Sequence, residues 1–99
     1  MESKSFTVRE EGEDYKIFVI MEKDLTKYPC PYDNDLRERL HHPQREEAIA
    51  ESWCWSLGAV GVAEVEIFPH EVYIKVFPET AKWEEIEKVL QELIDKIPD

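Results

Sequence analysis

The chain has 99 residues, 42% of them hydrophobic and 11% aromatic, which suits one domain with a single packed core and excludes a compositionally disordered chain. Its 23 acidic residues outnumber 12 Lys and Arg, giving a net charge of −11 that would repel a phosphate backbone, so we expect no nucleic-acid binding. No apolar run approaches the roughly 18 residues of a membrane span. Residues 1–10 lack the apolar region of a signal peptide, so we expect a cytoplasmic protein without membrane attachment.

The first predicted element is a hairpin over residues 5–21. Apolar and polar residues alternate before a turn around Gly12. The segment "YKIFVIM" follows and is apolar on both faces except at Lys16, as expected of a strand in mid-sheet. Residues 22–43 then contain prolines and turn formers, which predict a long connection. Within it, Leu36 and Leu40 are spaced for one short helical turn.

Residues 43–57 predict a helix. At about 100° per residue, its buried stripe consists of Ile49, Trp53 and Leu57. Cys54 falls on the flank of this stripe and Trp55 lies nearly opposite it. Trp55 is therefore either an exposed interface anchor or a residue covered by the 22–42 connection. Gly58 is expected to end the helix in a left-handed conformation.

Residues 62–77 predict a second hairpin that turns at Pro69-His70. One face carries Ala63, Val65 and Ile67, and the other carries Glu64, Glu66 and Phe68. This phase pairs Ile67 with Val72, Val65 with Ile74, and Glu64 with Lys75. A last helix, capped by Thr80, should follow. Its apolar stripe is Trp83, Ile86, Val89, Leu90, Leu93 and Ile97.

These elements predict an α+β domain of order ββαββα, formed by residues 1–99 as one unit. We expect a four-stranded antiparallel sheet with two helices packed on one face, because each element must bury its apolar side against another layer.

Chemical motifs are sparse. Cys30 and Cys54 lie too far apart in sequence for the C-x-x-C spacing of a zinc or cluster site, and free thiols are expected of both. The weak metal candidates are Cys30, His41 and His42, which would need long-range convergence. There is no glycine-rich phosphate loop and no hydrolase or metalloprotease motif. We therefore expect a protein that is not an enzyme.

From "HPQREEAIAESWCWSLGAVGVAEVEIFPHEVYIKVF" to "KWEEIEKVLQELI" the chain resembles the N-terminal domain of Nfu/NifU-type iron–sulfur scaffold proteins. The matching residues are Gly61, Val62, Val65, Ile67, Pro69, Val72, Ile74 and Trp83. The chain departs from that pattern at "EEGED" and at His70, and it lacks the separate cluster-binding C-x-x-C domain. The resemblance implies a freestanding relative of the half that binds no cluster. Iron or an iron–sulfur cluster would be connected with the chain only through this family association, and no bound cofactor is expected.

We therefore expect a non-catalytic protein-interaction module, accessory to iron–sulfur cluster assembly or iron handling as the resemblance implies. The candidate partner-binding residues are Trp55, Tyr32, Glu64, Glu66, Tyr73 and Lys75. Two alternatives stay open. One is a small metal-binding protein with Cys and His ligands, and the other is an acidic protein that mimics nucleic acid to occupy a basic site.

Overall fold

The computed structural model describes residues 6–29 and 45–98. Its elements are β1 (Thr7–Glu11), β2 (Tyr15–Val19), the 3₁₀ helix η1 (Leu25–Lys27), α2 (Arg45–Gly58), β3 (Val62–Ile67), β4 (Glu71–Val76) and α3 (Trp83–Asp95). The predicted order ββαββα is confirmed, with η1 added inside the 22–43 connection. The predicted turn at Leu36 and Leu40 lies outside the described residues.

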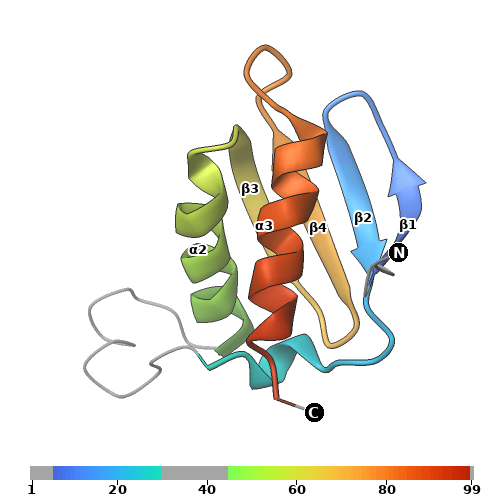
Figure 1. The fold of residues 1–99 in the computed structure, drawn as a ribbon, viewed down its shortest axis with the longest axis vertical. Coiled ribbons are helices and arrows are strands. Elements are labelled where there is room, and N and C mark those ends of the chain that lie inside the picture. The colour runs from blue at the N-terminus through green and yellow to red at the C-terminus, as the bar shows by residue number, and fades with distance from the viewer. Residues whose placement is uncertain (1–5, 30–44, 99) are drawn as a thin grey trace.

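The four strands form one antiparallel sheet in the order β1-β2-β4-β3. Both helices cover the same face of this sheet, with α2 beside β3 and α3 in front of β4 (Figure 1). As predicted, β2 is a central strand. The strands β1 and β3 form the two edges, and this placement of β3 determines where the candidate site lies.

The core fills the space between the sheet and the helices. The predicted stripe of α2 is fully buried, as are Ile86 and Leu90 of α3. Trp83 and Val89 are only partly buried. Ile94 is fully buried although the sequence analysis did not place it in the stripe. It lies beside Leu93, and the stripe of α3 is wide enough near its end to bury both.

The predicted pairing of the second hairpin is confirmed at Ile67↔Val72, Val65↔Ile74 and Glu64↔Lys75. A β-bulge between Val62 and Glu64 changes the start of β3. Because a bulge sets two residues against one on the partner strand, the strict alternation of the strand is broken before Glu64. Val62, which pairs with the buried Val76, is 3% exposed and Ala63 is partly buried, so Val62 adds to the core a residue that the alternation through Ala63, Val65 and Ile67 did not include.

The predicted left-handed glycine at position 58 is also wrong. Gly58 is the last residue of α2, and the chain continues through a hydrogen bond from the Gly61 amide to the Gly58 carbonyl (3.2 Å). Gly61 adopts the left-handed conformation, with φ = 96°. A Cβ atom there would lie 2.8 Å from the Ala81 Cα, so close packing as well as the backbone angle requires glycine.

The predicted cap of the last helix is wrong as well. The N-cap of α3 is Lys82, which makes no side-chain capping hydrogen bond. The Thr80 hydroxyl instead donates to the Phe77 carbonyl (3.4 Å), which also accepts from the Thr80 amide (3.0 Å). Thr80 therefore belongs to a separate turn that ends before the helix begins.

Candidate functional site

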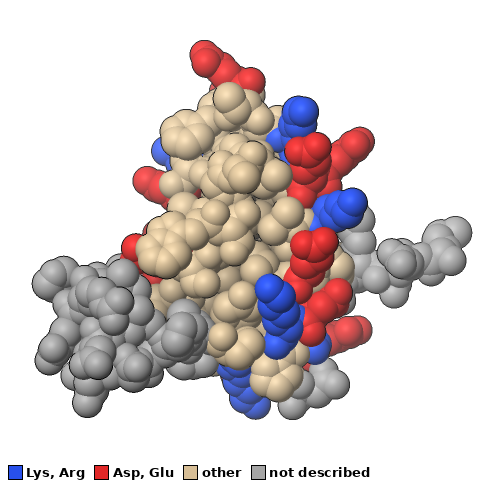
Figure 2. All heavy atoms as spheres, turned by 60° about the vertical axis from the view of Figure 1, so that its left-hand side comes forward, with Lys and Arg blue, Asp and Glu red and all other residues tan. Residues whose placement is uncertain are grey.

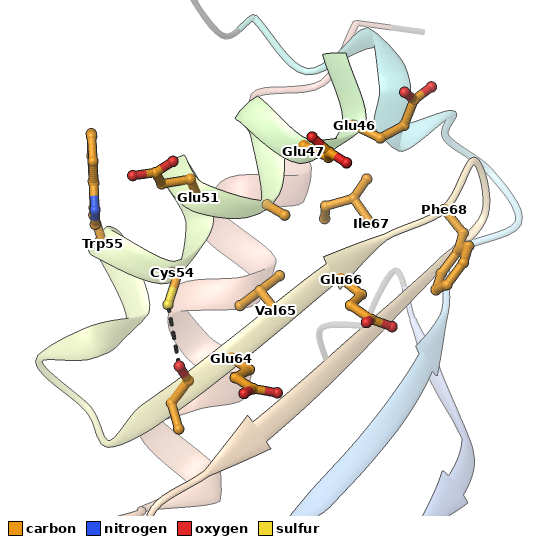
Figure 3. A pocket seen from close by; sticks show the side chains of 12 residues that line it. Glu46, Glu47, Glu51, Cys54, Trp55, Glu64, Val65, Glu66, Ile67 and Phe68 are labelled. Carbon is orange, nitrogen blue, oxygen red and sulfur yellow. Dashed lines mark hydrogen bonds between the residues drawn. The ribbon is translucent and has the colours of Figure 1, made fainter. Parts of the chain in front are cut away.

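A groove of about 910 Å³ lies between α2 and the edge strand β3. The helix lines it with Glu46, Glu47, Ala50, Glu51, Cys54 and Trp55, and the strand side consists of residues 63–68. In Figure 3, Val65 and Ile67 point from the strand toward the helix. The groove forms here because α2 lies over an edge strand, so no further strand closes its outer side among the described residues.

Two exposed aromatic side chains mark opposite ends of the groove (Figure 3). Trp55 on α2 is 66% exposed, and Phe68 after β3 is 46% exposed. An indole exposed to this degree leaves apolar area in water, and tryptophan is enriched among the residues that dominate binding at protein interfaces. These two side chains give the groove apolar anchoring points at both ends.

Trp55 has Glu51 one helical turn before it (Figure 3), but the residues next to it in sequence are uncharged. Residues 52–63 contain no acidic or basic side chain. Figure 2, which brings the α2 side of the molecule forward, shows a broad face without charged residues, bordered on the right by a column of alternating acidic and basic side chains. Trp55 thus lies in an uncharged stretch of α2, a setting that suits desolvation by a partner.

The groove itself is acidic. Five of its twelve lining residues are Glu, and none of the twelve is Lys or Arg. Figure 3 places Glu46, Glu47 and Glu51 along the helix and Glu64 and Glu66 along the strand. Negative charge therefore borders the groove on both long sides, which favours a cationic ligand.

Cys54 lies on the groove wall, and its thiol donates a hydrogen bond to the Ala63 carbonyl at the bulge (3.7 Å). Burial raises the pKa of this thiol, and the nearby carboxylates of Glu51 and Glu64 raise it further. Because the thiolate is the reactive form, this environment disfavours nucleophilic or redox chemistry at Cys54. The thiol instead joins α2 to β3.

The predicted site residues do not form one cluster. Trp55 is exposed on α2, whereas Glu64, Glu66, Tyr73 and Lys75 lie together on the open face of the sheet, where Glu64 is paired with Lys75 and Glu66 with Tyr73. Glu64 and Glu66 also line the groove, because β3 is the edge strand. Tyr73 stacks there on Tyr15, with ring centroids 5.6 Å apart. The predicted contact Tyr32 and the weak metal candidates Cys30, His41 and His42 lie outside the described residues. Within the described part of the chain, no group of three or more His, Cys, Asp or Glu side chains is arranged to hold a metal ion.

The sequence analysis missed most of the groove wall. It named none of Glu46, Glu47 and Ala50 as a site residue, and it gave Phe68 only as an outward residue of the hairpin. The groove side of α2 and the strand β3 come together because β3 lies at the edge of the sheet. No local sequence pattern indicates that position.

Comparison of the chain with protein-family models, curated proteins and solved structures gave no match. No helix in the described residues combines the length and apolar character needed to cross a membrane. The resemblance to the Nfu/NifU N-terminal domain thus remains an interpretation of the sequence pattern, and the geometry of the groove is the main guide to function.

Proposed function

We propose that this protein is a non-catalytic interaction module that docks a protein partner in the groove between α2 and β3. The observation that carries the proposal is the 66% exposure of Trp55 on the wall of that groove. A tryptophan in such a position would lose its water on docking, and a central interface tryptophan typically contributes about 2 kcal/mol or more to binding.

The partner class comes from the sequence resemblance. A relative of the Nfu/NifU N-terminal domain would dock a component of iron–sulfur cluster assembly or iron handling. In this role the chain itself holds no cluster and contributes a protein-binding surface. Burial raises the pKa of the Cys54 thiol, which supports this reading, since a cluster or metal needs deprotonated thiolate ligands.

A site-specific crosslinking experiment tests the proposal. A photoreactive amino acid is placed at position 55, and in a matched control at position 77, where Phe77 is comparably exposed (57%) but does not line the groove. In the native cell, position 55 should crosslink to a defined partner and position 77 should not. Iron analysis of the purified complex then tests the partner class. Equal crosslinking at both positions, or none at position 55, would contradict docking in the groove.

A further inference from the structure

One side of β3 carries backbone N–H and C=O groups that no described strand pairs with. The residues that carry these groups can be identified from the hydrogen bonds at both ends of β4. The Ile20 amide donates to the His70 carbonyl (2.8 Å) and the Val76 amide donates to the Asp14 carbonyl (2.7 Å). These bonds place the even-numbered residues of β4 in hydrogen-bonded pairs with β2. Since the backbone groups of a strand alternate between its two sides, the odd-numbered residues bond toward β3.

The other side of β4 agrees with this phase. The Phe68 amide donates to the Glu71 carbonyl (2.9 Å), so Glu66↔Tyr73 and Glu64↔Lys75 are the hydrogen-bonded pairs of the β3–β4 ladder. The N–H and C=O groups of Val65 and Ile67 therefore point away from β4. They lie along the free edge, where no described strand pairs with them.

This edge opens into the groove, which supplies the other contacts that an added strand needs. A strand placed about 4.8 Å from β3 would run beneath α2. Its side chains on the helix side would meet Val65 and Ile67 together with the small residues Ala50 and Cys54. On the opposite face its side chains would lie next to Glu64 and Glu66, which are the cross-strand neighbours there.

The charge of the groove selects among possible occupants. A second copy of the chain paired edge to edge would bring its own Glu64 and Glu66 against the same two carboxylates, and like charges opposite one another are destabilising. A segment with Lys or Arg at alternate positions would place cations against those two carboxylates.

We propose that a basic protein segment in extended conformation adds to β3 as a further strand of the sheet, with alternating apolar residues under α2 and basic residues beside Glu64 and Glu66. This inference rests on the proposed docking function of the groove and specifies its mode and its ligand. Main-chain hydrogen bonds to Val65 and Ile67 provide the register, and the carboxylates provide the preference for a cationic segment.

Hydrogen exchange on the full chain tests the mode of binding. The probe is a short blocked peptide that alternates lysine and valine. In the free protein, the Val65 and Ile67 amides should exchange quickly, while the Glu64 and Glu66 amides, paired with β4, should be protected and serve as internal controls. Saturating peptide should slow exchange at Val65 and Ile67 about tenfold or more and leave the two control amides unchanged.

Matched peptides separate strand addition from charge attraction alone. Methylating alternate backbone nitrogens that face β3 keeps the charge but removes donors, and should weaken binding about tenfold, because each methyl group abolishes one main-chain hydrogen bond to β3. A peptide of alternating glutamate and valine should not bind. On the protein, E64K and E66K should each weaken lysine-peptide binding about two- to fivefold at low salt, whereas E79K, an exposed charge outside the groove, should have little effect.

Three results would overturn the strand-addition proposal. The first is binding of the N-methylated peptide as tightly as its parent without protection of Val65 and Ile67. The second is protection of these amides in the free protein, which would assign the edge to a second copy if the protein is dimeric and to the chain's own residues if it is monomeric. The third is absence of binding by the lysine peptide while position 55 still crosslinks to a partner, which would leave the docking function intact.

Discussion

Trp53 and Trp55 are separated by one residue on α2, yet the first is fully buried and the second is 66% exposed. Two positions along an α-helix correspond to a rotation of about 200°, so the two indoles project from nearly opposite sides. The Trp53 ring packs edge-on against Tyr28, with centroids 5.4 Å apart. The same helix thus presents one tryptophan to the core and the other to solvent.

Replacing these two tryptophans by alanine should separate stability from binding. Trp53→Ala, like Leu90→Ala in α3, should lower the free energy of unfolding by about 2–5 kcal/mol, because each leaves a cavity in the core. Trp55→Ala should change it by less than about 0.5 kcal/mol and still weaken partner capture. Urea unfolding of the three variants checks the stabilities. Unfolding of the domain by Trp55→Ala would show that Trp55 belongs to the core.

Two glycines that follow one another closely should respond oppositely to alanine. Gly61→Ala should destabilise the protein by at least about 1–2 kcal/mol, since φ is 96° there and the new Cβ would meet the Ala81 backbone. Gly58→Ala should be neutral or stabilising by up to about 1 kcal/mol, because Gly58 lies in α2 and a Cβ would meet nothing within 4 Å. Thermal and urea unfolding measure both changes. Equal losses at the two sites would refute the assignment of Gly61 as the left-handed residue.

The Cys54 thiol should react slowly with iodoacetamide. Its pKa is raised by burial and by Glu51 and Glu64, so less thiolate is present at pH 8 than in an unstructured peptide, and the rate should rise only at higher pH. The double change E51Q/E64Q removes both negative charges, which should lower the pKa and increase the rate at pH 8. The measurement uses a Cys30→Ser background, so that only one thiol reacts. A rate equal to that of the free peptide, unchanged by E51Q/E64Q, would contradict this environment.

Protein purified without oxygen should hold no stoichiometric iron–sulfur cluster. The two cysteines of the chain cannot supply the usual four thiolate ligands, and the Cys54 thiol favours its protonated form. Absorption spectroscopy and iron analysis of the same sample check this. A cluster chromophore near one per monomer or dimer, lost in Cys30→Ser, would show instead that the chain is itself a cluster carrier.

The 3₁₀ helix η1 should be sensitive to acid. The Asp24 carboxylate accepts hydrogen bonds from the Thr26 hydroxyl and the Thr26 amide (2.9 Å), and these bonds lower its pKa. The folded state therefore binds this proton less readily than the unfolded state does. The stabilisation is complete above the usual carboxyl range and is lost as the pH falls through the lowered value. Asp24→Asn should reduce the loss of stability between pH 5 and pH 2, measured against wild type by urea unfolding, while an unchanged pH profile would exclude Asp24 as a contributor.

Much of this protein can be predicted from residue spacing alone, because helices and strands repeat with fixed periods. The alternation through Val65 and Ile67 was sufficient to predict the register with Val72 and Ile74. The helical period was sufficient to place Trp53 in the core and Trp55 opposite it. Both results depend on geometry within a few residues, where side-chain direction follows directly from the sequence.

Other features depend on contacts between segments that are distant in the chain. Gly58 and Thr80 are residue types that commonly end and begin helices. In the structure, Gly61, which packs against Ala81, is the left-handed residue, and Thr80 belongs to the turn that begins at Phe77. The bulge before Glu64 added Val62 to the core. Above all, pairing of β2 with β4 left β3 at the edge under α2. Strand order depends on which edges bury the most apolar surface together, and only that long-range packing created the groove.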